Sequence, residues 1–330
     1  MQSYLLREDQ LKMHGFARPT SDPGVASIVR KPDEIYDIQP VGSNGLRHKC
    51  FRCTKPFIVY NDGSYKSERC TYHEMRLYQS RGRQFFPCCQ GGKGSPGCQS
   101  STMHVTRGAK PPLESGYVQT VKHPVDGSYK PTVYALDCEM CYTTAALEVT
   151  RVTVVNTDNE SVYEKLVKPD NPITDYNTKF TGFTARDFVA VTTRLQDVQK
   201  DLLSLFYEDT ILLGHSLESD LVSLKVIHSK IVDTSVVFPH HKGLPYKRAL
   251  RNLARDHLHK TIQGSAAGHS SKEDAATCME LMMWKIKTVH SLDNNLQKKP
   301  IAKSIGYFRN YDYDYDFDYD TYDDFVNDSD

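Results

Sequence analysis

The chain has 330 residues, of which 25% are charged and 39% hydrophobic, with 41 basic and 41 acidic side chains. This length predicts two domains, or one domain with large appendages, and it excludes a peptide-sized disulfide scaffold. No stretch is long and apolar enough to span a membrane, and the early acidic residues do not fit a secretory signal peptide. We therefore expect a soluble intracellular protein with no membrane partner.

The net charge of zero hides an uneven distribution. Residues 311–330 contain nine Asp and no Lys, Arg or Glu, so residues 1–310 carry 41 basic against 32 acidic side chains, a formal excess of +9. A basic body fits a polyanionic partner. The tail alternates aromatic residues with Asp, and its uncompensated carboxylates predict a disordered segment at 291–330.

The first 49 residues contain no Cys and few apolar side chains, and we interpret them as an irregular arm. Six of the nine Cys follow between Cys50 and Cys98. Clustered Cys with neighbouring His in a reducing compartment indicate metal binding rather than disulfides. Eight candidate ligands occur as Cys-x2-Cys, Cys-x2-His, Cys-Cys and Cys-x5-His: Cys50, Cys53, Cys70, His73, Cys88, Cys89, Cys98 and His104.

Eight such ligands match two tetrahedral zinc ions whose coordination is closed, as in structural sites. If a single ion binds, we expect its ligands to be Cys50, Cys53, Cys70 and His73. This Cys/His block predicts a small zinc-binding module at 50–110. The Pro and Gly residues that follow it indicate a linker at 111–130.

From residue 131 the pattern changes to that of an α/β domain, expected to end near residue 290. Short apolar runs predict strands, and apolar residues three and four apart predict helices. A mixed sheet with helices on its faces is the natural packing of these elements. Strands are expected at 133–136, 147–155, 161–167, 210–213 and 231–238, and helices at 195–205, 218–227, 250–258 and from 271.

Two carboxylates, Asp137 and Glu139, follow the first of these strands. Residues two apart on a strand point to the same face, so both carboxylates would project together. Such a pair repels unless a cation lies between its members, and Mg²⁺ prefers oxygen ligands of this kind. Taken alone, the pair is more simply explained as a solvated strand end.

Two further segments place an acidic residue at a helix start. Asp220 lies in the first turn after a buried strand, and Asp274 follows the Gly- and Ser-rich loop that contains His269. Acidic residues stabilise helix N-termini in any case, so each of these positions has an ordinary structural explanation.

Together these segments resemble the DEDDh exonuclease superfamily, and within it the RNA exonuclease 1 branch. The matching stretches come in the order of that family and span most of residues 131–290. They are Tyr134-Ala-Leu-Asp-Cys-Glu-Met140, Leu147-Glu-Val-Thr-Arg-Val-Thr153, Val167-Lys-Pro-Asp-Asn171, Gly214-His-Ser-Leu-Glu-Ser-Asp-Leu221 and Gly268-His-Ser-Ser-Lys-Glu-Asp-Ala275. The Cys/His block also looks like the region that precedes the nuclease in this branch.

The resemblance implies a ribonuclease H-like fold and removal of nucleotides from the 3′ end of a nucleic acid. It implies that two Mg²⁺ or Mn²⁺ ions are held by Asp137, Glu139, Asp220 and Asp274. His269 matches the general base that takes a proton from the attacking water, and Met140 matches a position that packs on the terminal nucleotide. A core position is an equally good explanation for a methionine there.

We therefore expect a metal-dependent 3′-to-5′ exonuclease that acts on single-stranded 3′ ends of RNA. By analogy with the family we expect it in the nucleus, including the nucleolus. Two alternatives stay open: an exonuclease of DNA or oligonucleotides, and a non-catalytic RNA-binding protein built on the zinc module. Telling RNA from DNA requires a contact to the 2′-hydroxyl, which the sequence does not reveal.

Overall fold

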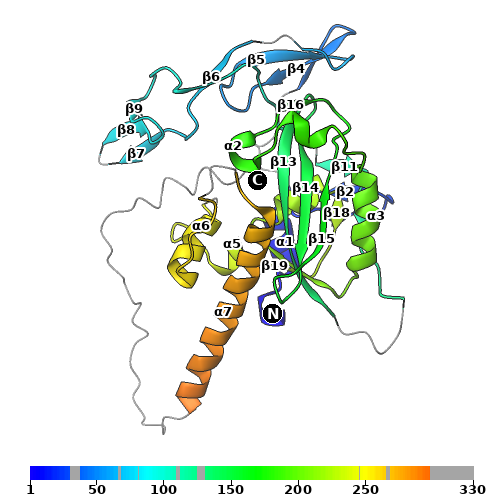
Figure 1. Ribbon diagram of the computed structural model, residues 1–330, viewed down its shortest axis with the longest axis vertical. Coiled ribbons are helices and arrows are strands. Elements are labelled where there is room, and N and C mark those ends of the chain that lie inside the picture. The colour runs from blue at the N-terminus through cyan, green and yellow to red at the C-terminus, as the bar shows by residue number, and fades with distance from the viewer. Residues whose placement is uncertain are drawn as a thin grey trace.

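The computed structural model describes residues 1–29, 38–65, 68–80, 82–108, 112–124, 131–244, 246–264 and 268–297, the last eight of these as backbone only (Figure 1). The segment 291–330 was expected to be disordered, but its residues 291–297 continue the last helix, α7 (Ser271–Gln297); the rest of it, including the acidic tail, lies outside the described residues. Among the described residues, no helix combines the length and apolar character that a membrane span needs.

A five-stranded path forms the centre of the molecule, in the order β15-β14-β13-β17-β19. The first three strands are antiparallel neighbours, whereas β13, β17 and β19 run parallel. A short strand, β16, pairs with the far end of β13. The bounds are β13 (Val133–Thr143), β14 (Leu147–Val155), β15 (Ser161–Leu166), β16 (Ile173–Asp175), β17 (Ile211–Gly214) and β19 (Ile231–Asp233). This is the strand order of a ribonuclease H-like sheet, and the predicted fold class is confirmed.

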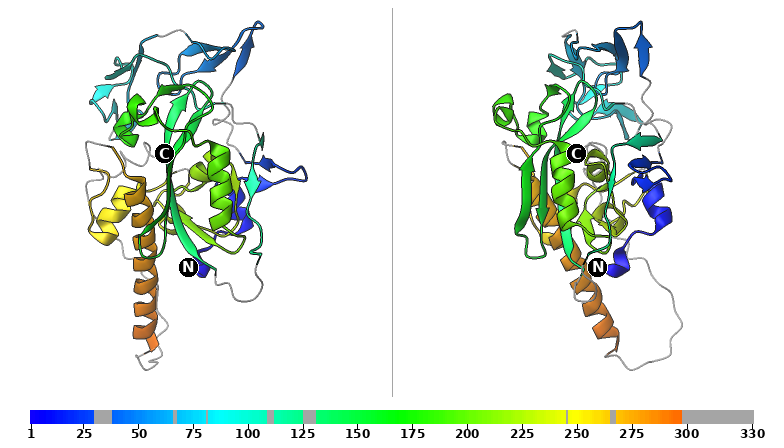
Figure 2. Two further views of the ribbon diagram at one scale, coloured as in Figure 1. Left: turned by 45° about the vertical axis from the view of Figure 1, so that its right-hand side comes forward. Right: turned by 90° about the vertical axis from the view of Figure 1, so that its right-hand side faces the viewer.

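Both faces of the sheet are covered, because alternate residues of its strands enter two different apolar clusters. Leu136 and Leu212 face one cluster, while Ala135 and Leu213 face the other. Figures 1 and 2 show α7 crossing one face and α3 lying on the other. The helices are α3 (Leu195–Leu205) and α4 (Glu218–Ser223) on one side, and α5 (Thr234–Val237), α6 (Leu250–Leu253), the π-helical turn η4 (Ala254–Leu258) and α7 (Ser271–Gln297) on the other.

Several element boundaries differ from the expected ones. The helix expected at 218–227 ends at Ser223, because Lys225 adopts a left-handed φ of 52° and the chain re-enters a strand, β18 (Val226–Ile227). The strand expected at 231–238 is short and turns into α5 after Asp233. The last helix, α7, continues to Gln297 and projects beyond the body (Figure 1).

The N-terminal segment is not the irregular arm that the sequence suggested. Residues 1–29 form η1 (Gln2–Tyr4), α1 (Glu8–Met13), β1 (Arg18–Pro19) and β2 (Val25–Ser27). Leu6, Leu11 and Phe16 lie in the same core cluster as the sheet, and each is less than a tenth exposed. This segment therefore belongs to the core of the central domain.

The expected linker is also ordered where the structure describes it. Strand β11 (Leu113–Ser115) pairs with β2, and β12 (Val118–Gln119) runs parallel to β18. Residues at both ends of the Cys/His block are thus tied to the central domain. The proposed division of the chain at 49, 110, 130 and 290 stays a prediction.

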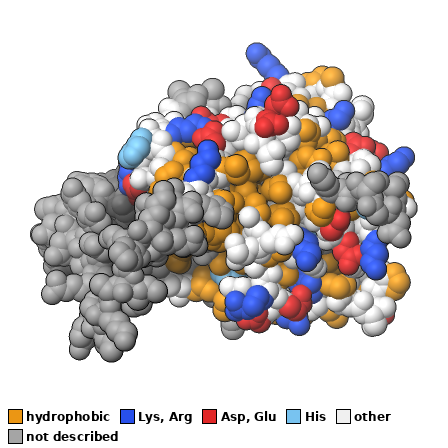
Figure 3. Space-filling model, turned by 90° about the horizontal axis from the view of Figure 1, so that it is seen from below, with side chains coloured by type: hydrophobic (Ala, Val, Ile, Leu, Met, Phe, Trp, Pro, Cys, Tyr) orange, Lys and Arg blue, Asp and Glu red, His pale blue; other side chains and the backbone are white. Residues whose placement is uncertain are grey.

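The Cys/His module consists of short strands, and its apolar residues form one small cluster around Cys50, Cys70 and Val105. They are β3 (Gln39–Val41), β4 (Gly45–Lys49), β5 (Pro56–Tyr60), β6 (Cys70–Tyr72), β7 (Tyr78–Ser80), β8 (Arg83–Phe86), β9 (Gly91–Gly92) and β10 (Gln99–Ser101). Figure 1 shows the module at one end of the molecule, above β16 and α2 (Thr178–Thr181). At the opposite end, Figure 3 shows basic and acidic side chains interspersed among apolar ones on the described part of that face.

Candidate active site and metal centres

Asp137 and Glu139 lie within β13 rather than after its end, as the sequence had suggested. The parallel pairing with β17 stops at Ala135, but the antiparallel pairing with β14 continues past both carboxylates. Because Cys138 enters the cluster on the α3 face, the two carboxylates point to the α7 face. The register shifts between Glu139 and Met140, so a strand irregularity lies directly beside the pair.

Asp220 is held in place by the turn that joins β17 to α4. A second acidic residue, Asp233 at the end of β19, accepts backbone N–H bonds from Ser216 at 3.1 Å and Leu217 at 3.0 Å. Asp233 is fully buried. Burial opposes its charge, but Lys247, His215 and hydrogen bonds from Ser235 lower the pKa of Asp233. Sequence reasoning missed Asp233, which braces the helix start that carries Asp220.

Asp274 lies in the first turn of α7. The N-terminus of that helix is fixed on two sides: Ser270 Oγ accepts the N–H of Glu273 at 3.3 Å, and Ser271 Oγ bonds to Thr153 Oγ1 of β14 at 2.7 Å. Gln263 Nε2 donates to Asp274 Oδ2 at 2.9 Å. The helix therefore presents Asp274 to the sheet from a rigid start.

His269 lies in the loop immediately before α7, and that loop packs closely on α2. Its N–H donates to the carbonyl of Phe180, and the two rings meet edge to face with centroids 5.5 Å apart. Gly268 has a φ of 94°, and a Cβ there would lie 2.4 Å from Gly182 N. Only glycine allows this approach, so α2 sets the position of the histidine loop.

The charges of the four acidic residues act on two buried thiols, one on each face of the sheet. Burial, together with the charges of Asp220, Asp137 and Glu139, raises the pKa of Cys138. Burial, together with Asp137, Asp274 and Asp233, raises the pKa of Cys278 on α7. The same Asp137 acts on both thiols, which places the carboxylates of β13, α4 and α7 in one neighbourhood.

This donor set fits a divalent cation. Glu139, Asp220 and Asp274 are 4%, 3% and 2% exposed, so their mutual repulsion is only weakly screened by water. Oxygen-only ligands from carboxylates are those of Mg²⁺ and Mn²⁺. Met140, by contrast, is 3% exposed, packs in the core cluster and accepts a bond from Ser223 Oγ at 3.3 Å, as expected of a core methionine.

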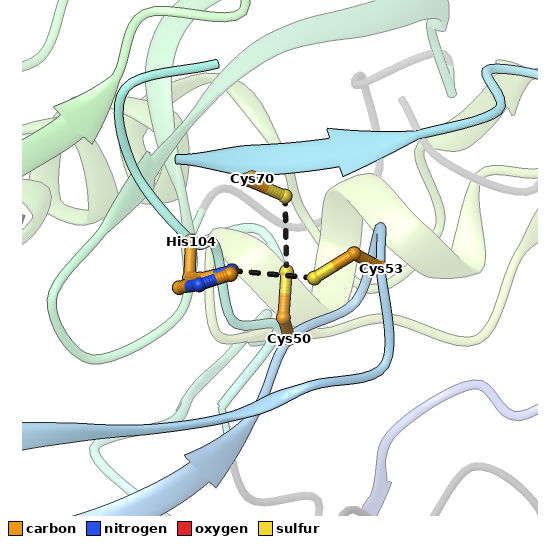
Figure 4. A group of neighbouring side chains, drawn as sticks. All are labelled: Cys50, Cys53, Cys70 and His104. Carbon is orange, nitrogen blue, oxygen red and sulfur yellow. Dashed lines mark hydrogen bonds between the residues drawn. The ribbon is translucent and has the colours of Figure 1, made fainter. Parts of the chain in front are cut away.

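The structure brings the eight Cys and His candidates into two groups of four, with the ligand atoms of each group within 4.8 Å of one another. The first group converges between β6 and the turn after β4 (Figure 4). Its members are Cys50, Cys53, Cys70 and His104, and those of the second group are His73, Cys88, Cys89 and Cys98. The expectation that Cys50, Cys53 and Cys70 share an ion with His73 is therefore wrong.

Strand geometry explains the correction. Cys50 and Cys53 flank a tight turn, in which Thr54 N bonds to Cys50 O, and they can face one ion. Cys70 begins strand β6, whereas His73 follows its last residue, Tyr72, so the two ligands lie at opposite ends of this strand. In the antiparallel partner β10, Gln99 pairs with Tyr72 and Ser101 pairs with Cys70. Cys98 therefore lies at the end of the ladder near His73, and His104 follows the end near Cys70.

The spacing of the ligand atoms fits zinc. A tetrahedral ion with Zn–S bonds of about 2.3 Å holds its sulfurs about 3.8 Å apart. The Sγ atoms of Cys50 and Cys70 are 3.7 Å apart, and those of Cys88 and Cys98 are 3.5 Å apart. His73 Nε2 donates to Ser95 O at 3.1 Å, which leaves Nδ1 facing Cys89 Sγ at 3.4 Å.

Comparison with known proteins agrees with the motifs. No protein-family model matches the chain. The chain is 48% identical over 293 residues to the human RNA exonuclease 1 homolog, covering 87% of this chain and 23% of that protein. It is 46% identical over 293 residues to the chimpanzee exonuclease GOR, covering 87% of this chain and 41% of that protein. A solved structure, the Neurospora crassa Pan2 catalytic unit, is 24% identical, covers 56% of this chain and 33% of its own, and overlaps with a TM-score of 0.44.

The mixed sheet covered by helices is the fold that the resemblance to exonucleases predicted. In sequence, the chain is related to the RNA exonuclease 1 branch of the exonucleases, as the motifs indicated. It spans less than half the length of the human and chimpanzee relatives, 23% and 41% respectively.

Proposed function

We propose that this chain is a metal-dependent 3′-to-5′ exoribonuclease. The observation that carries the proposal is the convergence of acidic residues from β13, α4 and α7, next to a loop histidine that α2 holds in place. Relatives that carry the name RNA exonuclease share close to half of the residues over most of the chain. The basic excess of residues 1–310 suits an RNA substrate.

Each proposed catalytic residue has a distinct task. Asp137, Glu139, Asp220 and Asp274 would hold two Mg²⁺ or Mn²⁺ ions. Such a pair of ions supplies charge stabilisation to the attacking and leaving oxygens of an in-line displacement at phosphorus. His269 would accept the proton of the attacking water, a role that a neutral imidazole nitrogen can take. Because the loop of His269 is anchored by its backbone to α2, the ring has a fixed approach to the site.

The Cys/His module is proposed to hold two structural zinc ions. All four positions of each group are filled by protein ligands, so neither ion would keep an open position for chemistry. Because its strands are short and its apolar cluster is small, the module would depend on these ions for its stability.

The deciding experiment is degradation of a 5′-labelled single-stranded RNA with Mg²⁺ or Mn²⁺, beside a DNA of the same sequence. Products that shorten stepwise from the 3′ end are expected for the wild type and are expected to disappear in Asp137→Asn and His269→Ala. Asp158→Asn and His241→Ala change exposed residues of the same types and serve as matched controls.

Other outcomes would select one of the alternatives. If RNA is bound but stays intact with every metal, the chain is a binding module and the catalytic proposal is refuted. Faster loss of DNA than of RNA would favour a DNA exonuclease. A nuclear location, proposed by analogy with the family, is tested by imaging the tagged chain in cells.

A further inference from the structure

The Cys/His module contacts the central domain through an arginine that lies between two metal ligands. Arg52 is located between Cys50 and Cys53, and its side chain is 13% exposed. Its Nη1 lies 2.5 Å from Asp175 Oδ2. The guanidinium also stacks over the rings of Tyr72 and Tyr142, at 5.0 and 5.1 Å from their centroids. Arginine fits such a stacked, paired position better than lysine does.

Asp175 passes this contact on to α2. It ends strand β16, and its second oxygen, Oδ1, accepts the N–H of Asn177 at 2.8 Å. Asn177 has a left-handed φ of 53° and directly precedes α2. A four-residue helix such as α2 is not stable alone, so its position depends on contacts of this kind.

The second metal group contacts the same helix. Lys179 of α2 pairs with Glu74, the residue after His73. One neighbour of each metal group therefore binds the segment that spans residues 175–181. The other end of this segment carries Phe180, whose carbonyl accepts the N–H of His269 and whose ring packs against the imidazole.

We propose that Arg52 is a positioning residue for His269, so that the Cys/His module acts as part of the exonuclease site rather than as a separate appendage. The route runs from Arg52 to Asp175, through α2 and Phe180, to the histidine loop. The inference rests on the proposed role of His269. It makes the module affect turnover at the exonuclease site, although all the proposed catalytic residues belong to the central domain.

The central domain supports α2 independently at its start, which makes the proposal testable without unfolding. Thr181 Oγ1 donates to Tyr176 O at 2.8 Å, and Cys141 Sγ donates to the same carbonyl at 3.2 Å. The bond from Cys141 keeps this segment on β13, so loss of the Arg52 contact is expected to loosen Asp175 and, through α2, the carbonyl of Phe180, while the fold persists. The metal ligands are untouched by the change.

The variants are Arg52→Lys and Asp175→Asn, with Arg18→Lys as the matched control. Arg18 is equally buried, with a side chain 11% exposed, and pairs with Glu8 in the N-terminal segment. The first measurement is hydrogen exchange at the His269 amide, which needs no catalysis. We expect exchange about tenfold faster in both variants, with unchanged zinc content and an unchanged amide in the control.

The second measurement is a kinetic cycle on single-stranded RNA. General-base catalysis contributes at least about a hundredfold to rate, so a loosened base should lower kcat about tenfold with KM nearly constant. In a His269→Ala background, Arg52→Lys should cause no further loss, because the group it positions is gone.

The outcomes separate the two proposals. Unchanged exchange at His269 in Arg52→Lys would overturn the positioning role, whether or not the chain degrades RNA. An equal loss of kcat with and without His269 would also overturn it, while leaving the exonuclease proposal intact. Altered exchange in a chain without nuclease activity would support the structural coupling and refute the catalytic function.

Discussion

The approach of the histidine loop to α2 provides a direct test of how precisely His269 must be placed. In Gly268→Ala, the new Cβ would lie 2.4 Å from Gly182 N and 2.6 Å from Phe180 O. Ordinary contact begins at 3.4 Å, so the loop must move by 1.0 Å, the difference between 3.4 and 2.4 Å. Both obstructing atoms belong to the backbone and cannot rotate away.

A displacement of this size at a catalytic group costs about a hundredfold in rate. We expect Gly268→Ala to lower kcat on single-stranded RNA by about that factor. The left-handed φ of 94° adds strain, and we expect the free energy of unfolding to fall by about 1–3 kcal/mol. Turnover would be measured at saturating RNA, and stability by thermal unfolding.

Gly264→Ala is the matched control in the same loop. The nearest atom to a Cβ at that position is Thr261 Cγ2 at 3.8 Å, and the backbone there needs no left-handed φ. This variant should keep both turnover and stability. A Gly268→Ala protein that is folded and turns over RNA as fast as the wild type would show that the loop does not control the reaction.

Three further predictions concern the core, the metal groups and pH. Leu11→Ala should lower the free energy of unfolding by about 2–5 kcal/mol, whereas Met13→Ala, at an exposed position, should change it little. Equal effects of the two variants in urea unfolding would contradict the core role of the N-terminal segment. His104→Ala and Cys98→Ser should each lose one of two zinc ions by elemental analysis and keep the other, and a loss of both ions in either variant would count against independent ligand sets. Burial lowers the pKa of His228 from 6.5 to about 4, so folding disfavours its charged form. The contribution of this residue to the free energy of unfolding is full above pH 6.5 and falls as the pH drops toward 4, by about 3 kcal/mol in all. This pH dependence should flatten in His228→Gln.

The chemistry of the site was predictable, but its supports were not. The acidic residues and His269 stand in recognisable segments, so sequence alone suggested their grouping. Asp233 was missed because its role depends on β17 and β19 lying side by side, a neighbourhood that no spacing along the chain reveals. The full extent of β13 was missed for a related reason. Charged residues such as Asp137 and Glu139 normally mark the end of a strand, but β13 continues past them because it stays paired with β14.

The N-terminal segment illustrates a different limit. Leu6, Leu11 and Phe16 are five residues apart, which matches neither the period of a helix nor that of a strand. Only Leu11 lies in a helix, α1. The N–H of Leu6 donates to Ile231 O of β19 at 2.9 Å, and the N–H of Phe16 donates to Leu11 O at 3.0 Å. Their burial follows from the tertiary path of the segment, so a reading based on periodicity treats them as scattered apolar residues.

The two metal groups share one structural frame, and this bears on how the module works. Strand β6 and its partner β10 hold Cys70 and Ser101 opposite each other, and Tyr72 opposite Gln99. One ligand group therefore forms at each end of a single three-residue ladder. Because the ladder is so short, removal of either ion should loosen the ladder, although the other ion keeps its own four ligands. Arg52, beside the ligands of one group, binds Asp175 just before α2, and Glu74, beside a ligand of the other group, binds Lys179 of α2. A disturbance of either metal group therefore reaches the histidine loop through one of these contacts.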